Sequence, residues 1–219
     1  TLAVSSVGTL TVTAGTFDAN NQNMSTGILS STGAGVARAI TLGSGTLTLN
    51  ALAGTVLDFA SAAGNLTLSA ASSTIVVSSA ANNTRTLNFG VSKTYGTVSL
   101  VNSGFATYST DLIAGTAVTI ATLNMTAPIT IRMNATFTMN VTNAIAWAGT
   151  AYNNAILIFP GGTQTPTIAL AGGSTLDWCV FGGITFTGSP VATNSIDMKN
   201  NTGITIGGPA GGVVGVIGS

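Results

Sequence analysis

The organisation of the chain is clearest in residues 38–49, which read Arg38-Ala39-Ile40-Thr41-Leu42-Gly43-Ser44-Gly45-Thr46-Leu47-Thr48-Leu49. In both halves of this stretch apolar side chains alternate with threonine. A period of two is expected when one face of a β-strand is buried and the other is solvated. The Gly-Ser-Gly run between the halves is typical of a tight turn. The stretch therefore predicts two short strands joined by a turn.

The same pattern recurs along most of the chain, often at intervals of about ten residues. The predicted strands are residues 9–13, 46–49, 65–68, 74–77, 86–89, 97–100, 118–120, 129–131, 137–139, 167–170, 184–187 and 203–206. Clusters of Gly, Asn, Ser and Ala separate them. The best helix candidate, residues 52–63, contains Gly54, Thr55 and Val56, and favours a strand with a small-residue turn. The sequence predicts an all-β protein.

The composition favours a β-solenoid over the alternative, a β-sandwich. Charged residues make up 5% of the chain, with no Glu and only two Lys. A sandwich normally carries charged side chains on its outward positions, whereas stacked coils can place ladders of Thr there. With three strands to a coil, each coil of a parallel β-helix-like solenoid takes about 20 to 30 residues. We expect one β-repeat domain over residues 1–202. Residues 203–219, rich in Gly and Val, are expected to form a C-terminal capping strand, an interchain arm or a linker.

Charge and hydropathy exclude several classes of partner. The net charge is zero, whereas nucleic-acid binding needs a basic surface. No apolar run approaches the ~20 residues of a membrane-spanning helix, and β-branched residues recur too often for a disordered chain. A neutral protein also lacks electrostatic protection against self-association. The expected partner is therefore a second copy of the chain, in a homo-oligomer or lattice, with no nucleic acid and no membrane.

The residue inventory argues against catalysis. Without His there is no Ser-His-Asp triad, no Cys-His pair and no His metal site. The one cysteine, Cys179, has no disulfide partner in the chain and is expected to be a buried thiol. Asp177 and Asp197 are 20 residues apart, about one coil, and could stack ~5 Å apart as an acid–base pair. The alternative, which we favour, is that each caps a turn.

Two other polar patterns have ordinary structural explanations. The run Asp18-Ala19-Asn20-Asn21-Gln22-Asn23 offers oxygen ligands for Ca²⁺ but has one carboxylate, and favours a polar turn. Thr-x-Thr repeats, as at Thr46 and Thr48, could form an ice-binding face, but their spacing is irregular. We predict no catalytic, cofactor-binding or metal-binding residues, no cofactor, and a chain that is not an enzyme.

The order of elements resembles a known group of proteins. The residues that carry the resemblance are Gly8 to Asn23, Thr26 to Ser31, Arg38 to Leu49, Asn65 to Leu68, Thr163 to Ile168 and Asn200 to Ile206. They are similar to the Gly/Thr/Asn-rich, solenoid-like segments of tailed-bacteriophage structural proteins. The resemblance implies a virion fibre, tail appendage or capsid-decorating protein, located in the virion or outside the cell. Its partners would be other virion proteins and a host surface glycan.

Two alternatives share this pattern. Bacterial or archaeal cell-surface adhesins and subunits of extracellular filaments use similar Gly/Thr/Asn-rich β repeats. Glycan-cleaving tailspikes use paired carboxylates on a solenoid, for which Asp177 and Asp197 are the candidates here. An open groove with the two carboxylates facing each other would favour the enzyme, and a closed Thr-lined face would favour the structural alternatives.

Overall fold

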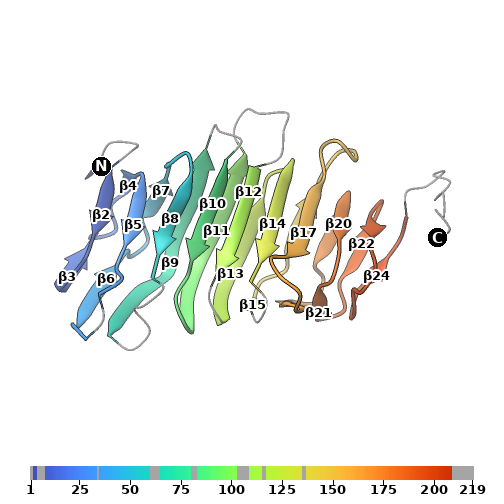
Figure 1. Cartoon of the computed structure of the whole chain (residues 1–219). Coiled ribbons are helices and arrows are strands. Elements are labelled where there is room, and N and C mark those ends of the chain that lie inside the picture. Colours follow the sequence, from blue (N-terminus) through green and yellow to red (C-terminus); the bar gives the residue numbers. More distant parts are fainter. Residues whose placement is uncertain are drawn as a thin grey trace.

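The regular elements of the computed structural model are all β-strands (Figure 1). The structure describes residues 2–3, 8–33, 35–59, 65–79, 83–102, 109–114, 117–134 and 137–208. Among them is no helix long and apolar enough to cross a membrane. The strands are β1 (Leu2–Ala3), β2 (Thr9–Thr11), β3 (Gly15–Asp18), β4 (Met24–Thr26), β5 (Ile28–Ser30), β6 (Arg38–Thr41), β7 (Thr46–Leu49), β8 (Gly54–Asp58), β9 (Leu66–Ser79), β10 (Thr84–Asn88), β11 (Lys93–Asn102), β12 (Ser109–Ala114), β13 (Ala117–Met125), β14 (Ile129–Met133), β15 (Thr138–Val141), β16 (Ala146–Ala148), β17 (Ile156–Pro160), β18 (Thr167–Leu170), β19 (Thr175–Asp177), β20 (Cys179–Phe181), β21 (Thr185–Thr187), β22 (Val191–Thr193), β23 (Ile196–Asp197) and β24 (Thr205–Ile206).

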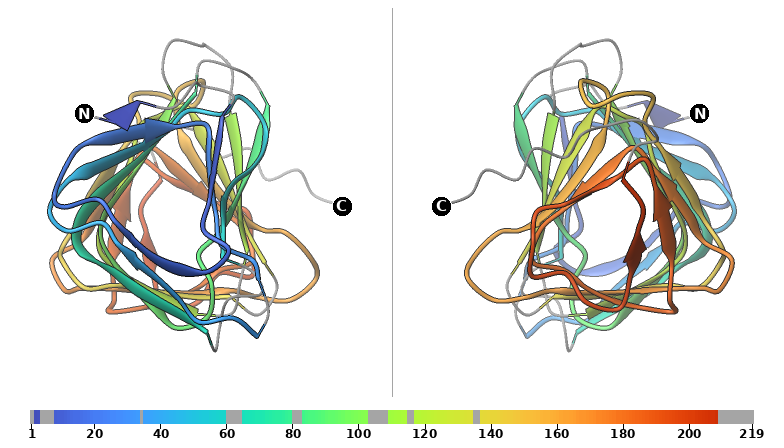
Figure 2. Two further views of the ribbon diagram at one scale, coloured as in Figure 1. Left: turned by 90° about the vertical axis from the view of Figure 1, so that its left-hand side faces the viewer. Right: turned by 90° about the vertical axis from the view of Figure 1, so that its right-hand side faces the viewer.

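The strands stack in parallel into a solenoid. One sheet has nine strands, in the order β2-β5-β8-β10-β12-β14-β17-β20-β23. An eleven-stranded sheet follows the path β1-β4-β7-β9-β11-β13-β15-β18-β21, with β3 and β6 joined beside it, and β16-β19-β22-β24 form a third sheet. Each turn of the chain adds one strand to each side, and the turns enclose a common core (Figure 2). The predicted β-solenoid is confirmed, and the antiparallel sandwich alternative is wrong.

Three long strands turn a corner of the solenoid. In β9, residues 66–69 pair with β6 and residues 74–77 pair with β7. The sequence predicted two separate strands here, but they form one continuous strand that bends between its two paired segments. The register between β9 and β11 shifts between Tyr95 and Thr97. Gly96 lies at this bend, where a Cβ atom would stand 2.4 Å from the carbonyl oxygen of Ser73, so the bend excludes any side chain.

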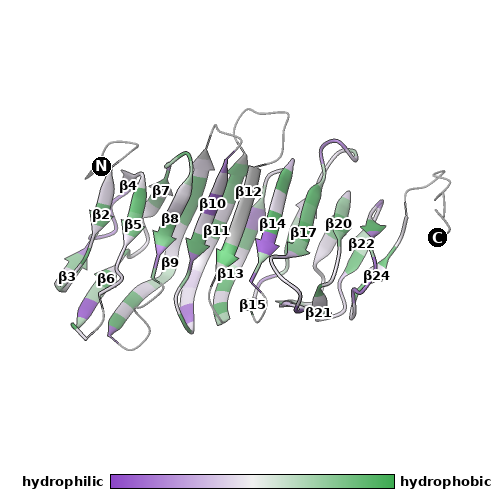
Figure 3. Ribbon diagram, in the orientation of Figure 1, coloured by the Kyte–Doolittle hydropathy of each residue, from purple (hydrophilic) through white to green (hydrophobic). Residues whose placement is uncertain are grey.

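The core is a set of columns, because in-register parallel strands place like positions on top of one another. Leu29, Leu57 and Leu87 occupy successive positions of one column, and each is 0% exposed. Figure 3 shows hydrophobic, green bands and near-neutral, pale bands along β9. Of the inward residues that the pattern predicts, the buried ones are Leu47, Leu49, Leu66, Ile75, Val77, Leu87 and Phe89, whereas Leu68 is only partly buried.

Outward positions carry the expected threonine ladders. Thr46, Thr74, Thr97 and Thr122 are register partners on successive coils. A second ladder joins Thr138, Thr167, Thr185 and Thr202. In that ladder the Thr202 hydroxyl donates a hydrogen bond to the Thr185 hydroxyl (3.2 Å). Neighbouring coils are therefore joined on the outside by neutral hydrogen bonds.

The coils shorten toward the C-terminus. Leu29 pairs with Leu57, 28 positions further on, and Leu57 with Leu87, 30 positions on, in keeping with the predicted coil length. Phe181 pairs with Asp197, only 16 positions on. In the predicted segment 203–219, β24 pairs with β22 and so continues the solenoid. Residues 209–219, where the capping strand, arm or linker was expected, lie outside the described residues.

The core assignment can be tested by placing a charge at an inward position and, separately, at an outward position of the same strand, β10. Leu87→Asp buries an unpaired carboxylate, and we expect it to lower the free energy of unfolding by more than about 4 kcal/mol or to prevent folding. Thr86→Asp, at the neighbouring outward position, should cost less than about 1 kcal/mol. Urea unfolding measures both, and similar stabilities for the two variants would contradict the strand orientation.

Candidate functional site

The structure does not stack Asp177 on Asp197. Asp177 ends β19, and its register partners are Ala148 and Thr193. Asp197 lies in β23, in the nine-stranded sheet, and pairs with Phe181. The stacking that the spacing allowed does not occur, because the coil that follows Asp177 has 16 residues, so a step of 20 residues passes the corner into another sheet.

The two carboxylates bind different donors, those of Asp177 on the next coil and those of Asp197 in its own turn. Oδ1 of Asp177 accepts hydrogen bonds from the Thr193 hydroxyl and the Asn194 amide, both at 2.9 Å. Oδ1 of Asp197 accepts from the backbone N–H of Lys199 (2.8 Å) and the Asn201 amide (2.6 Å). Asp197 therefore caps a turn, as the favoured interpretation predicted, whereas Asp177 joins its corner to the next coil. The two carboxylates are not register partners, and the hydrogen bonds of their Oδ1 atoms share no donor.

Cys179 is a core residue, as expected. Its side chain is 0% exposed, and its backbone N–H donates to the Ser195 hydroxyl (3.0 Å). Burial raises the pKa of the Cys179 thiol to about 12; the hydrogen bond from Sγ to the Asp177 carbonyl oxygen lowers the pKa, and the nearby Asp177 charge raises it. A thiol with such a pKa is not a nucleophile near neutral pH.

Side-chain oxygens of the Asp18–Asn23 run accept hydrogen bonds from neighbouring backbone N–H groups. Oδ1 of Asp18 accepts from the Asn20 N–H (2.8 Å). Oδ1 of Asn21 accepts from the Ser44 N–H, and Oδ1 of Asn23 from the Thr46 N–H, both at 2.9 Å. The run is thus a polar turn tied to the next coil. Within the described residues there is no group of three or more His, Cys, Asp or Glu side chains that could hold a metal ion.

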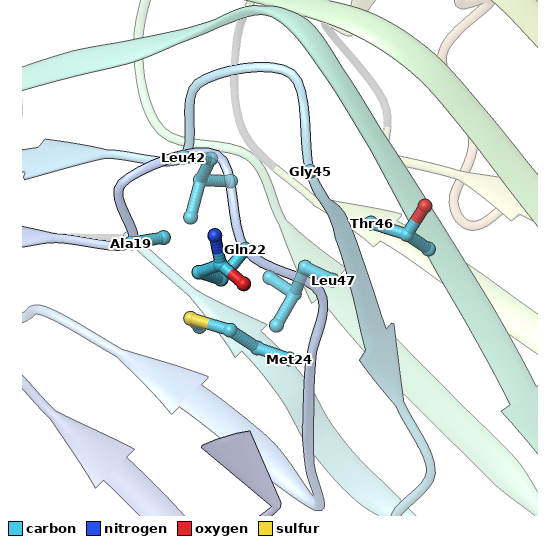
Figure 4. Close-up of a pocket in the computed structure, with 7 residues that line it drawn as sticks. All are labelled: Ala19, Gln22, Met24, Leu42, Gly45, Thr46 and Leu47. Atoms are coloured by element: carbon cyan, nitrogen blue, oxygen red, sulfur yellow. The ribbon is translucent and has the colours of Figure 1, made fainter. Parts of the chain in front are cut away.

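A small hollow lies beside this turn (Figure 4). Its lining residues are Ala19, Gln22, Met24, Leu42, Gly45, Thr46 and Leu47. It encloses about 140 Å³, including its open mouth, but leaves no room for a water molecule. Because apolar core side chains form most of its wall, we regard it as a packing gap between two coils and not as a ligand site.

The sequence analysis did not predict that two arginines, Arg38 and Arg85, would be buried. Arg38 is 3% exposed, and Nε donates to the Ser31 hydroxyl (2.9 Å) while Nη1 donates to the Val36 carbonyl oxygen (2.9 Å) and to that of Gly33. Arg85 is 0% exposed and is in register with Asp111. The signal was available, since Arg85 stands two residues before the inward Leu87.

One exposed aromatic pair was also missed. The rings of Tyr152 and Trp178 meet edge to face, with centroids 5.1 Å apart and an interplanar angle of 79°. Tyr152 is 44% exposed, and Trp178 is partly exposed. Trp178 forms the corner between β19 and β20, and its φ of 50° is left-handed. Nothing in the local sequence Asp177-Trp178-Cys179 predicts that conformation.

Comparison of the chain with protein-family models, with curated proteins and with solved structures finds no match.

The buried state of Cys179 predicts slow thiol chemistry. At pH 8 a pKa of about 12 lowers the thiolate fraction on the order of 10³-fold relative to an ordinary cysteine. We expect native protein to react with a thiol-specific disulfide reagent at least that much more slowly than protein unfolded in urea. Rapid native labelling would contradict the placement of Cys179 in the core.

The same thiol links stability to pH. The pKa is about 12 in the folded protein and about 8.5 in an unfolded chain, so above pH ~8.5 only the unfolded state loses the proton. Below that pH the thiol does not lower the free energy of unfolding. As the pH rises from there toward the folded pKa, the free energy of unfolding falls by about 1.4 kcal/mol per pH unit. Urea unfolding between pH 8 and 10 measures the slope. Cys179→Ala should show a shallower slope, and equal slopes would refute the linkage.

Proposed function

We propose that this chain is a non-enzymatic structural protein of a tailed-bacteriophage virion, as a fibre, tail appendage or capsid-decorating protein, that assembles with copies of itself. The observation that carries the proposal is the parallel solenoid that the described strands form along the chain. Such a molecule is a rigid rod whose stability is built from contacts between neighbouring coils. Its setting in a virion rests on the sequence resemblance over residues 8–206.

The end coils supply the surfaces for self-association. β2 and β3 border the first coils, and β23 and β24 border the last. An edge strand presents unpaired backbone donors and acceptors, which proteins usually protect with Lys, Pro or bulges. On the C-terminal edge the charged residues near β23 are Asp197 and Lys199, and Asp197 already binds the backbone of Lys199. These edges are suited to pairing with another β-rich chain.

The exposed surface carries even less charge than the sequence suggests. Of the five cationic side chains, Arg38 and Arg85 are buried. Lys93 is partly buried and donates from Nζ to the Leu66 carbonyl oxygen (2.6 Å). Arg132 and Lys199 are the cations that stand exposed. Repulsion between copies is therefore weak, and contacts between them must be apolar packing and neutral hydrogen bonds.

Assembly should survive changes in salt and pH. Interactions between exposed charges are screened beyond about 10 Å at 0.1 M salt, whereas apolar contacts are kept or strengthened by salting-out ions. Without His, no ordinary side chain titrates near neutrality. We expect the same oligomer by light scattering in low and high NaCl, and at pH 6 and pH 8. Dissociation to monomers under either change, or a wild-type protein that is monomeric throughout, would overturn the proposed assembly.

The non-enzymatic part of the proposal has its own test. The wild-type protein should release no reducing sugar from host-type polysaccharides, because Asp177 and Asp197 lie in different sheets. Release that disappears in both Asp177→Asn and Asp197→Asn would establish the tailspike-type hydrolase instead.

A further inference from the structure

Trp178 occupies a strained position that smaller residues fill in the next coil. Because Asp177 is the register partner of Thr193, Trp178 lies in line with Asn194. Asn194 has φ 46° and Trp178 has φ 50°. Asn and Gly tolerate this left-handed backbone, whereas it is a true outlier for a bulky residue. The corner therefore keeps a tryptophan where asparagine would fit without strain.

Trp178 is less deeply buried than the other tryptophan of the chain. The chain has two tryptophans. Trp147 is 1% exposed, and its indole N–H donates to the Leu123 carbonyl oxygen (2.7 Å). Trp178 remains partly exposed and packs against the exposed Tyr152. Strained backbone conformations are concentrated at binding and catalytic sites, and Trp178 keeps part of its ring at the surface, which points to a task for the ring there.

The backbone around Trp178 holds the ring firmly. The Trp178 N–H donates to the Thr193 carbonyl oxygen (3.3 Å), and the Trp178 carbonyl oxygen accepts from the Ile156 N–H (3.2 Å). The Gly149 N–H donates to the Asp177 carbonyl oxygen (2.9 Å). These bonds fix the corner to the coils on both sides. The aromatic surface is thus presented on a rigid element, as a binding site requires.

Polar residues neighbour Trp178 in the chain and on the next coil. The Asp177 carboxylate is anchored through Oδ1 by Thr193 and Asn194. Its other oxygen, Oδ2, binds no donor among the described residues. Thr193 and Asn153, which is on the same loop as Tyr152, are both exposed. A partly exposed aromatic pair that neighbours an anchored carboxylate and an exposed hydroxyl offers both apolar and hydrogen-bonding contacts.

We propose that Trp178, Tyr152 and Asp177 form a saccharide-binding site. A pyranose ring has an apolar C–H face, which packs on the electron-rich face of an aromatic ring, and equatorial hydroxyls that donate to carboxylate oxygens. The bracketing residues Asp177, Thr193 and Asn194 are polar, whereas a protein-binding aromatic anchor is typically enclosed by a dry rim. The site rests on the proposed function, since it would give a virion surface protein its contact with a host glycan.

The two tryptophans provide a matched fluorescence experiment. The probes are methyl glycosides of glucose, galactose, mannose and N-acetylglucosamine, with their linear trisaccharides, at up to about 10 mM, the range in which weak saccharide binding occurs. We expect at least one probe to shift and saturate the emission of the wild type and of Trp147→Phe. In Trp178→Phe, the remaining buried Trp147 should not respond. Tyr152→Ala and Asp177→Asn should each weaken binding about tenfold or more.

Stability separates a binding residue from a structural one. Trp178→Asn, which copies the residue of the next coil, relieves the backbone strain. We expect an unfolding midpoint equal to or above that of the wild type, together with loss of saccharide binding in isothermal titration. A midpoint several degrees lower would make Trp178 a structural residue and would overturn the proposal.

Two further outcomes would also overturn it. If no probe changes the Trp178 emission, there is no saccharide site of this kind. If the wild type forms an oligomer and the Trp178→Asn variant is monomeric, the aromatic pair is a protein interface. Failure of the proposed function would look different, as a wild type that never assembles while Trp178 still responds to saccharide.

Discussion

The parallel hydrogen-bond ladder between successive coils is the constraint on which the rest of this structure depends. It holds neighbouring strands about 4.8 Å apart and in register. Each side chain therefore stacks on the side chains at the same position in the coils on both sides. Apolar columns such as Leu29, Leu57 and Leu87 are one result, and the ladder of Thr46, Thr74, Thr97 and Thr122 is the other. One geometric rule thus produces both a dry interior and a neutral exterior.

The same rule explains why polar groups can be buried in this core. Tyr95 is 0% exposed, and its hydroxyl donates to the Phe89 carbonyl oxygen (2.6 Å). Burial raises the Tyr95 pKa well above its usual range, so the hydroxyl keeps the proton that it donates. Ser31, also 0% exposed, donates to the Val12 carbonyl oxygen (2.9 Å) and accepts from Arg38. Such groups meet the backbone at corners, where the ladder leaves carbonyl oxygens available.

How far the sequence predicts this molecule depends on the range of the interaction concerned. Strand alternation is local, and it correctly placed Leu47, Val77 and Leu87 inside. Coil length is not local, because it depends on how many residues each corner uses. For that reason the step from Asp177 to Asp197 was misjudged, and the segments before and after residue 70 were not recognised as one strand. The left-handed Trp178 could not be predicted at all, since the coils on either side impose its conformation.

The direction of the ladder has a mechanical consequence. Hydrogen bonds between coils lie roughly along the axis of the solenoid, so a pulling force along that axis loads one coil junction after another in series. The weakest junction then sets the load that the rod can bear. β11 and β13 are paired from Lys93 to Leu100, whereas β1 and β4 at one end and β20 and β23 near the other are each paired at two positions. Under tension the molecule should therefore unwind from its end coils, and the broad middle coils should remain closed.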